Sequence, residues 1–465
     1  MNERLMRNIK KFKLSPIAII ALSFAFTILL GSIFLFFPFA HNQGVSISYF
    51  DALFTSTSAT CVTGLVSLKD GVAATFNLAG RIIIAILIQI GGIGVVTFAV
   101  ILFVITNRKL TYTNQSLIKE SRNLDSYKGI KRVLLEVFAI TIFFEFIGAI
   151  LIFLILFYKY NYPMDTSFGY AFFHSISSFN NAGFDLFGTT SLMIFKDDIW
   201  LNLITALLII FGGLGYLVII DSLSKKFNFK RFRLHTKIVL TFTLVLILVG
   251  TLLIYLCEIN NSTEVSFFGA FFMSVSTRTA GFSLYDLSKF RDITLIIMIV
   301  FMFIGASPGG TGGGVKTSTI LIFITYVCSL VTDKKPHAFR RSFSGSIIRR
   351  ALLIILLGLL FFIFGLALIT VFESNYNYIL DGVKYNNYVD GSSTFNLMDY
   401  TFEAMSAYGT VGLSTGFTPY YSVGSKIVLC TLMYVGRLGP ITISTAFKSK
   451  NTQAFRYAEE DVSIG

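Results

Sequence analysis

The sequence predicts an all-α polytopic membrane protein. It consists of four span–pore-loop–span repeats, with eight transmembrane spans and four re-entrant half-helices around a central pore. Three observations lead to this fold class: the composition, the long apolar runs and a loop pattern that occurs four times. Apolar residues make up 54% of the 465 residues and charged residues only 14%, which does not describe a soluble surface.

Apolar runs long enough to span a bilayer are easy to find, because about 20 apolar residues cross the hydrocarbon core. They lie near residues 17–39, 78–105, 133–158, 198–220, 238–257, 293–330, 351–372 and 424–446. The first follows a basic segment, as in a signal peptide, but its apolar run is longer than a typical signal core. We therefore interpret it as a retained span.

Lysine and arginine predict how the spans are oriented, because basic loops stay on the cytoplasmic side. Most of them lie in five segments: the N-terminus, residues 108–132, 225–237 and 334–350, and the tail from Lys448. These segments alternate with charge-poor ones, so both termini are expected in the cytoplasm. The net charge of +13 then reports topology, and no nucleic-acid partner is expected.

Motifs of catalytic and metal sites are absent from the sequence. The four cysteines, Cys61, Cys257, Cys328 and Cys430, have neither C-x-x-C spacing nor nearby histidines, so neither a disulfide framework nor a zinc site follows. Motifs such as G-x-S-x-G and H-E-x-x-H do not occur. We therefore expect no catalytic residues, no enzyme activity and no cofactor in this chain.

Four loops on the charge-poor side share one pattern, a short apolar stretch followed by a polar turn that ends in glycine. They read ALFTSTSATCVTGL, AFFHSISSFNNAGF, AFFMSVSTRTAGF and TFEAMSAYGTVGL. When they are aligned on Gly64, Gly183, Gly281 and Gly412, a serine precedes the glycine by six residues in three loops and by five in the third. Such self-similarity at long intervals indicates internal repeats.

A second glycine pattern, G-x-x-G, follows each loop inside the next apolar run. It begins at Gly91, Gly212, Gly309 and Gly436. One copy is weak, since small residues also allow close helix packing. Four copies in register with four loops support the repeats, which we place at residues 1–130, 131–233, 234–345 and 346–465.

Each loop is predicted to re-enter the membrane and not to cross it. Non-helical backbone at membrane depth is tolerated only where it is buried in protein or lines water. Four convergent loops can replace the hydration shell of a cation with backbone carbonyls, and glycine permits the required backbone angles. The half-helices would point their negative C-terminal ends at the same place.

At these residues the chain resembles the Trk/Ktr/HKT potassium transporter superfamily, and most closely its bacterial Ktr membrane subunit (KtrB/KtrD). The resemblance is carried by TCVTG at 60–64, FNNAGF at 179–184, TRTAGF at 277–282, YGTVGL at 408–413, the glycine-rich break after Ser307, and Arg437. It covers nearly the whole chain. It implies a potassium selectivity filter, with the ion held by the backbone of the four loop glycines.

The filter residues implied by the resemblance come from all four loops. They are Thr60, Cys61, Val62, Thr63 and Gly64; Asn180, Asn181, Ala182 and Gly183; Arg278, Thr279, Ala280 and Gly281; and Gly409, Thr410, Val411 and Gly412. For Arg278 we favour a side chain that braces its loop over a barrier to cations. For Asn180 and Asn181 we favour hydrogen bonds that stiffen the loop over direct ligation.

A glycine-rich break interrupts the sixth apolar run, which is too long for one straight span. Its residues are Ala306, Ser307, Pro308, Gly309, Gly310, Thr311, Gly312, Gly313, Gly314 and Lys316. The break resembles a phosphate-binding loop, but its lysine is displaced by Val315 and no strand precedes it. We instead interpret 306–316 as a gate across the pore, latched by Arg437; a passive kink braced by that arginine is the alternative.

The resemblance also implies how the protein works in its membrane. It implies sodium-stimulated potassium uptake across a bacterial plasma membrane by a homodimer, seated in lipid on a cytoplasmic ring of nucleotide-binding subunits like KtrA or KtrC. A passive cation channel without sodium coupling has the same visible parts. A membrane enzyme or receptor whose repeats merely pack is a second alternative, and it predicts no ion flux.

Overall fold

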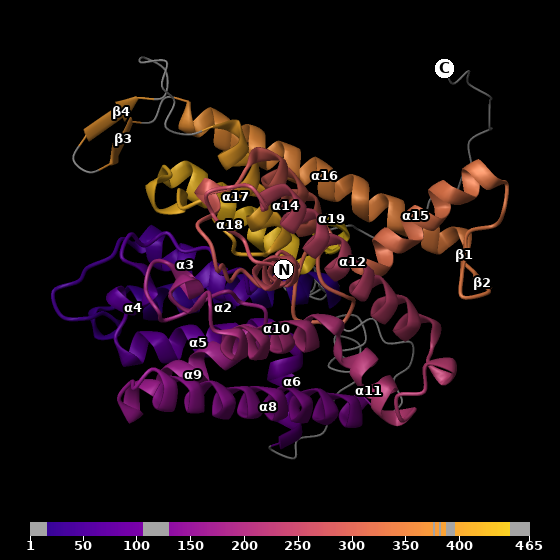
Figure 1. Ribbon diagram of the computed structural model, residues 1–465, viewed down its shortest axis with the longest axis horizontal. Helices are drawn as coiled ribbons and strands as arrows, with labels where there is room; N and C mark the ends of the chain where they lie inside the picture. Colours follow the sequence, from indigo (N-terminus) through magenta and orange to yellow (C-terminus); the bar gives the residue numbers. More distant parts are fainter. Residues whose placement is uncertain (1–15, 106–129, 375–376, 381–382, 387–395, 447–465) are drawn as a thin grey trace, which may run out of the picture.

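The chain forms a bundle of helices in the computed structural model, which describes residues 16–105, 130–374, 377–380, 383–386 and 396–446 (Figure 1). The predicted basic segment at the N-terminus, most of the segment at 108–132 and the C-terminal tail lie outside the described residues. Four helices are long and apolar enough to cross a membrane. They are α2 (Pro16–Phe36), α8 (Ile130–Leu154), α12 (Leu234–Glu258) and α16 (Gly345–Glu373).

Each long helix packs against the short helix that follows it. The short helices are α3 (Tyr49–Cys61), α9 (Met164–Phe179), α13 (Phe267–Ser276) and α17 (Leu397–Gly409). Polar caps start several of them: Ser48 accepts from the N–H of Asp51, and Ser266 from that of Gly269. Their lengths are those expected of half-helices that do not span.

A second apolar helix follows each short helix, and it is broken in every case. The pairs are α5 (Leu78–Ile93) with α6 (Val95–Ile105), α10 (Ile199–Leu214) with α11 (Tyr216–Ser224), α14 (Asp292–Phe303) with α15 (Thr317–Thr332), and α18 (Val423–Leu438) with α19 (Pro440–Ala446). The first two pairs are bent by 97° and 92°. Among the described residues, the candidate spans number four, or six if each of these bent pairs counts as one.

The prediction that residues 78–105, 198–220 and 424–446 each form one unbroken helix is therefore wrong. The helix ends at the last glycine of each G-x-x-G, where Gly94, Gly215 and Gly439 have φ of 91°, 90° and 86°. Only glycine adopts such angles without a Cβ penalty, so each glycine turns the chain out of the helix. The break expected in the third repeat is present, and there the non-helical segment runs from 304 to 316.

Small elements fill the connections. They are η1 (Pro38–Ala40), α4 (Gly71–Thr75), η2 (Ile155–Lys159), η3 (Ser191–Phe195), η4 (Phe229–Arg231), η5 (Leu287–Lys289) and η6 (Thr418–Tyr420). Two antiparallel hairpins pair β1 (His337–Ala338) with β2 (Arg341–Ser342), and β3 (Asn377–Leu380) with β4 (Val383–Asn386). Figure 1 shows both hairpins at the periphery of the bundle.

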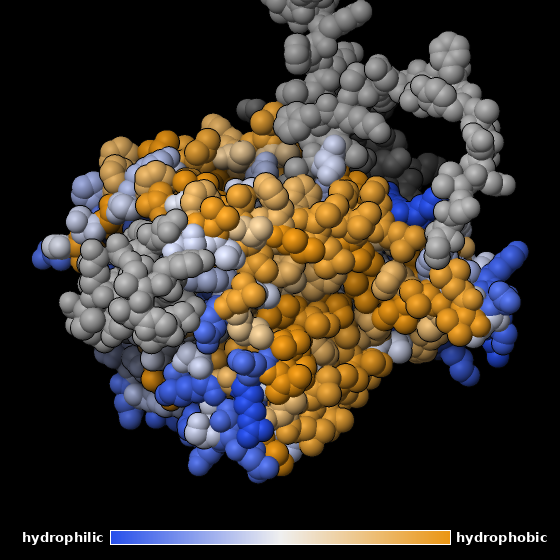
Figure 2. Space-filling view, turned by 90° about the horizontal axis from the view of Figure 1, so that it is seen from above, coloured by the Kyte–Doolittle hydropathy of each residue, from blue (hydrophilic) through white to orange (hydrophobic). Residues whose placement is uncertain are grey.

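Large apolar side chains cover much of the outer surface, as the view in Figure 2 shows. Phe26 on α2 is 66% exposed and Phe364 on α16 is 64% exposed. A soluble monomer rarely exposes so wide an apolar area, whereas a membrane protein presents it to lipid. Polar side chains gather at the edges of this surface in the same view.

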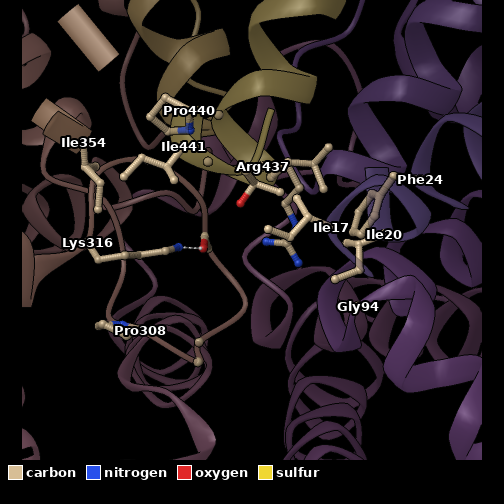
Figure 3. Close-up of a pocket in the computed structure, with 18 of the residues that line it drawn as sticks. Ile17, Ile20, Phe24, Gly94, Pro308, Lys316, Ile354, Arg437, Pro440 and Ile441 are labelled. Atoms are coloured by element: carbon tan, nitrogen blue, oxygen red, sulfur yellow. Dashed lines mark hydrogen bonds between the residues drawn. The ribbon is translucent and has the colours of Figure 1, made fainter. Parts of the chain in front are cut away.

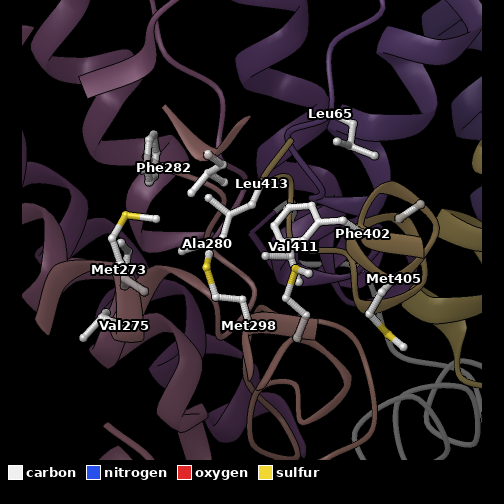
Figure 4. Close-up of a cluster of buried hydrophobic side chains, with 14 of the residues drawn as sticks. Leu65, Met273, Val275, Ala280, Phe282, Met298, Phe402, Met405, Val411 and Leu413 are labelled. Atoms are coloured by element: carbon white, nitrogen blue, oxygen red, sulfur yellow. The ribbon is translucent and has the colours of Figure 1, made fainter. Parts of the chain in front are cut away.

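The interior is a close-packed apolar core between the third and fourth short helices (Figure 4). Met273 and Phe402 come from those helices, Met298 from α14, and Val411 and Leu413 from the loop after α17. These side chains are almost fully buried. The core therefore holds the loops after α13 and α17 in fixed positions relative to α14.

Candidate functional site

The four loops that follow the short helices begin in the same way. In each, a backbone N–H just before the loop glycine bonds to the carbonyl of the recurring serine. The bonds run from Thr63 to Ser58, Ala182 to Ser177, Ala280 to Ser276, and Val411 to Ser406, at 2.8–2.9 Å. In two loops the serine hydroxyl also accepts from the N–H of Gly64 or Gly412, at 3.0 Å. The recurring serine thus fixes the turn from helix into loop.

The loop backbones share an unusual sequence of angles. Positive φ occurs at each loop glycine and again two residues earlier, at Val62, Asn181, Thr279 and Thr410. Side chains and carbonyls of an ordinary strand alternate between its two sides. A left-handed residue at every second position cancels that alternation, so successive carbonyls can face one way. This backbone form suits a row of carbonyl ligands.

The four loop glycines meet in a closed ring. A Cβ added to Gly64 would lie 2.6 Å from the carbonyl oxygen of Ala182, and one added to Gly183 2.8 Å from that of Ala280. A Cβ on Gly281 would lie 2.4 Å from the carbonyl oxygen of Val411, and one on Gly412 2.0 Å from that of Thr63. Each glycine therefore faces the backbone of the next loop, and no larger residue fits.

Two polar side chains anchor loops from behind, each three residues before its loop glycine. The Nδ2 of Asn180 donates to Glu145 at 2.8 Å and to Gln89 at 2.9 Å. The buried guanidinium of Arg278 donates from Nη1 to the carbonyl of Thr243 at 3.2 Å. Both side chains thus bond to neighbouring helices. The amide of Asn181 lies 3.4 Å from the hydroxyl of Thr279, in the next loop.

A cavity of about 400 Å³ opens on one side of the glycine ring, and all four loop glycines line it. Asp185, Asp286 and Lys69 bring charge to its wall. Burial raises the pKa of Asp185 to about 6, although bonds from the N–H of Phe187 and from Ser191 oppose this rise. At neutral pH the carboxyl is therefore mostly ionised and offers a cation a negative neighbour.

The segment 304–316 lies directly against the other side of the loops. The hydroxyl of Thr311 donates to the carbonyl of Phe179 at 3.2 Å. A Cβ on Gly312 would collide with the Thr279 hydroxyl at 1.9 Å, and one on Gly313 with the Thr410 hydroxyl at 2.2 Å. The glycines of this segment are thus required by its close approach to three of the four loops.

Backbone bonds dock the same segment onto the break between α10 and α11. The N–H groups of Ser307 and Thr311 donate to the carbonyls of Gly213 and Gly212, at 3.0 and 3.1 Å. In return the N–H of Tyr216 donates to Gly309 at 3.3 Å. The broken helix end of the second repeat therefore supplies the seat for the segment.

Two basic side chains, Arg437 on α18 and Lys316 of the segment itself, bond to carbonyls of the segment. Arg437 donates to the carbonyls of Thr311, Gly91 and Gly92, the last at 3.3 Å. Lys316 donates to the carbonyls of Gly312 and Gly313, at 2.7 and 3.3 Å. Both line a second cavity of about 290 Å³ (Figure 3). The segment and Arg437 thus line this cavity, whereas the four loop glycines line the other one.

All four groups of loop residues singled out in the sequence meet in one place, and the residues singled out at 306–316 lie beside them together with Arg437. The third G-x-x-G differs from the other three, as the break expected at 306–316 implies. It lies inside the segment and not at a helix end, since α14 ends at Phe303. Sequence reasoning missed Gln89 and Glu145, although a glutamate within the run 133–158 was a visible signal.

The comparisons with known proteins agree with this arrangement. The sequence matches the family described as "TrkH: Cation transport protein" over residues 20–457. It is 35% identical to the Ktr system potassium uptake protein B of Vibrio alginolyticus over 96% of this chain and 94% of that protein. It is also 33% identical to the potassium/sodium uptake protein NtpJ of Enterococcus hirae, over 99% of this chain and 100% of that protein.

A solved structure shares the fold. The potassium transporter TrkH of Vibrio parahaemolyticus superposes with a TM-score of 0.70 at 18% identity, covering 94% of this chain and 86% of that one. The present chain thus has the fold of a helical membrane protein. It belongs to the TrkH family of cation transport proteins, which are transporters and not enzymes. The predicted family membership is confirmed.

Proposed function

We propose that this protein takes up potassium ions across a bacterial plasma membrane through a selectivity filter made by its four loops. The ring of loop glycines, with positive φ at two positions in every loop, carries the proposal. It lies between a cavity lined by the glycines and a second cavity behind the segment 304–316. Potassium is proposed as the transported ion because relatives of this chain are potassium uptake proteins.

The proposed arrangement has four repeats and eight spans around one pore, with both termini in the cytoplasm. Each second span is then a broken helix, and the cavities of about 400 Å³ and about 290 Å³ are the outer and inner mouths. The potassium ion would lose water in the filter and gain backbone carbonyls at the residues of the four loops. The negative ends of α3, α9, α13 and α17 would stabilise it there.

The segment 304–316 is proposed as the gate of this pore, with Arg437 as its latch. It blocks the path between the glycine ring and the inner cavity, and it is held by hydrogen bonds that a rearrangement can break. Sodium stimulation belongs to the same proposal. The protein would form a homodimer on a cytoplasmic ring of nucleotide-binding subunits, and this ring would control the gate. The Ktr-named relatives are described as parts of a Ktr system, which supports such partners.

Flux measurements on purified protein in liposomes test the proposed function. We expect uptake of potassium that exceeds uptake of sodium at equal concentration, and that rises when sodium is added on the same side. Potassium flux with no response to sodium would leave a passive channel in place of the coupled transporter. No flux of either ion, from folded protein, would contradict the proposal.

Glycine at the first filter position tests the selectivity. The resemblance to the Trk/Ktr/HKT superfamily implies that serine at this position goes with sodium transport, as it does in the plant members. Gly64→Ser introduces a side chain where a Cβ would lie 2.6 Å from the carbonyl oxygen of Ala182. We expect the preference for potassium over sodium to fall about tenfold, because both the backbone and the ligand field change. An unchanged preference at normal expression would contradict the assignment.

Docking of the cytoplasmic partner has its own test. Co-purification of the protein with its cognate nucleotide-binding subunits at low salt is expected, since basic cytoplasmic segments favour acidic surfaces. High salt should weaken the complex because charge–charge attraction is screened. Failure to co-purify at low salt would remove the regulatory ring from the proposal and leave the filter untouched.

A further inference from the structure

Glu145 is a buried carboxylate in the middle of α8, and two amide side chains surround it. Its Oε1 accepts from Asn180 Nδ2 at 2.8 Å, and its Oε2 from Gln89 Nε2 at 3.1 Å. The circle closes because Gln89 Oε1 also accepts from Asn180, at 2.9 Å. The ion pairs found in the described part of the chain involve other carboxylates.

The hydrogen-bond pattern fits an ionised carboxylate. Both oxygens of Glu145 face N–H donors, and an ionised carboxylate only accepts. A protonated form would need an acceptor for its own hydrogen. Turning over the Gln89 amide to provide one would press its nitrogen against Asn180 Nδ2, a donor against a donor. The circle of three side chains therefore favours the ionised carboxylate, against the cost of burying its charge.

The charge of the second repeat has no equivalent in the first or the third. A serine of each of the first three short helices donates to a carbonyl on the preceding long helix: Ser56 to Ile28, Ser175 to Glu145, and Ser274 to Ile247, at 2.6–2.9 Å. Glu145 thus stands where the first and third repeats have isoleucine. Packing at this position needs only an apolar side chain, and a buried charge at membrane depth is costly.

The carboxylate of Glu145 lies behind the proposed filter. Asn180, which Glu145 holds, precedes the filter glycine Gly183 by three residues. The same position of the next loop holds Arg278, a buried cation whose Nε has no partner. Gly183 and Gly281 are neighbours in the glycine ring. A lone arginine there would repel a cation in the filter, and a carboxylate behind the adjacent loop would offset it.

We propose that Glu145 supplies a fixed negative charge behind the second filter loop, offsetting Arg278 and strengthening the binding of the transported potassium ion. The inference rests on the proposed function, because it takes the glycine ring to be the filter. Asn180 links the carboxylate of Glu145 to the filter loop, and Gln89 fixes the orientation of that carboxylate. Glu145 is thus a residue that sets ion affinity without touching the ion.

The test is potassium uptake into liposomes by the full chain, with Glu145→Gln compared with the parent. Glutamine keeps the size of the side chain and removes the charge. We expect the KM for potassium to rise about tenfold with the maximal rate within about twofold, because ground-state attraction is lost. Glu258→Gln is the matched control, because Glu258 is also a buried carboxyl but has no bond to a filter loop residue. It accepts from the hydroxyl of Thr294 and the N–H of Arg291, at the start of α14. Its KM should match the parent's.

Two further variants separate charge from shape. Glu145→Asp keeps the charge, so its KM should stay within about threefold of the parent's. In the double variant E145Q/R278Q both charges are gone, and the KM should return toward that of the parent. Binding can also be followed without transport, as the potassium concentration that raises the melting temperature of the purified protein.

The outcomes discriminate clearly. A KM for Glu145→Gln equal to the parent's overturns the inference and leaves the filter proposal standing. A tenfold rise in Glu145→Asp assigns the effect to shape and likewise overturns it. If Glu145→Gln does not fold, Glu145→Asp and the potassium-dependent melting temperature decide. A parent protein that moves no potassium defeats the proposed function itself, which is a different result.

Discussion

At the glycine ring the four loops are alike, whereas on the side of the segment 304–316 the third repeat differs from the other three. Every loop has positive φ at its glycine and two residues earlier, and every loop turns on the same backbone bond to a serine carbonyl. On the side of the segment, α5, α10 and α18 each end at a single glycine. In the third repeat α14 is followed by the long segment 304–316.

The difference follows from what each side has to do in the proposed function. A dehydrated cation needs ligands on all sides, so the four loops must present equivalent carbonyls. Closing a path needs only one obstructing element at the axis. One repeat can therefore provide the gate, and the other three can supply its seat. The bonds from the segment to Gly212 and Gly213, and from Arg437 to Gly91 and Gly92, show that seat.

The equivalence of the loops breaks most severely if one filter glycine gains a side chain. Gly412→Ala would place a Cβ 2.0 Å from the carbonyl oxygen of Thr63, at φ +94°. Overpacking costs about 1–3 kcal/mol, so we expect potassium uptake to fall about tenfold to hundredfold. Radiotracer uptake at matched protein amount measures it.

Gly44→Ala is the control for Gly412→Ala. It has φ +79° with nothing within 4 Å of the added Cβ, so it carries backbone strain without a collision. We expect it to transport as the parent does. Equal losses in the two variants would show that backbone strain, and not the close approach of the loops, limits the filter.

The proposed gating role of the third repeat is tested by removing the Arg437 side chain. Arg437→Ala loses charge-assisted hydrogen bonds to Thr311, Gly91 and Gly92. Hydrogen bonds to charged groups contribute about 1.5–3 kcal/mol, so the open fraction and the potassium flux should rise about tenfold. Deleting residues 310–313 should also raise the potassium flux. Both should weaken the dependence of flux on the regulatory subunits.

Vesicle flux with and without those subunits measures the effect. Folded Arg437→Ala that conducts no faster than the parent, together with a deletion that behaves likewise, would make the segment a passive kink and Arg437 a brace.

The seat of the segment can be tested with two glycines of the same backbone angle. Gly215→Ala places a Cβ 2.7 Å from the carbonyl oxygen of Pro308 and 3.1 Å from the N–H nitrogen of Gly310. Gly94→Ala meets only the Thr97 hydroxyl at 3.7 Å. Each carries a left-handed strain of about 1–2 kcal/mol. Only Gly215→Ala should displace the segment, and its potassium flux should therefore rise about threefold over that of Gly94→Ala.

Equal flux through the two variants, with equal melting temperatures, would mean that docking on the second repeat does not hold the gate. The comparison is internally controlled because φ is 90° at Gly215 and 91° at Gly94.

The smallest expected effect concerns the cavity lined by the four loop glycines. Burial raises the pKa of Asp185 to about 6. Its carboxyl is therefore ionised above that pH and neutral below it, so its attraction for potassium is present at pH 7 and lost as the external pH falls toward 5. We expect potassium uptake at subsaturating concentration to fall about twofold across this window. Asp185→Asn should have the low-pH rate throughout, and a variant that keeps the parent's pH profile would assign the titration elsewhere.

Much of this architecture is encoded locally and was predictable. The apolar runs indicate the helices because membrane depth requires about 20 apolar residues in sequence. The four loop glycines could be aligned because the recurring serine and glycine lie within one short segment of each other. The glycine-rich run from Ala306 was visible as a break because such a segment cannot stay helical in lipid.

Tertiary structure alone decided the rest. A G-x-x-G inside an apolar run looks the same whether glycine packs against a neighbour or ends the helix, so the sharp bends at Gly94 and Gly215 were not predictable. Positive φ at Val62 and Thr410 is likewise invisible, since nothing in those residue types favours it. The contacts of Asn180 with Gln89 and of Arg437 with Thr311 join residues 91 and 126 positions apart. Sequence periodicity reports only neighbours along one helix, whereas these bonds depend on how separate helices come together.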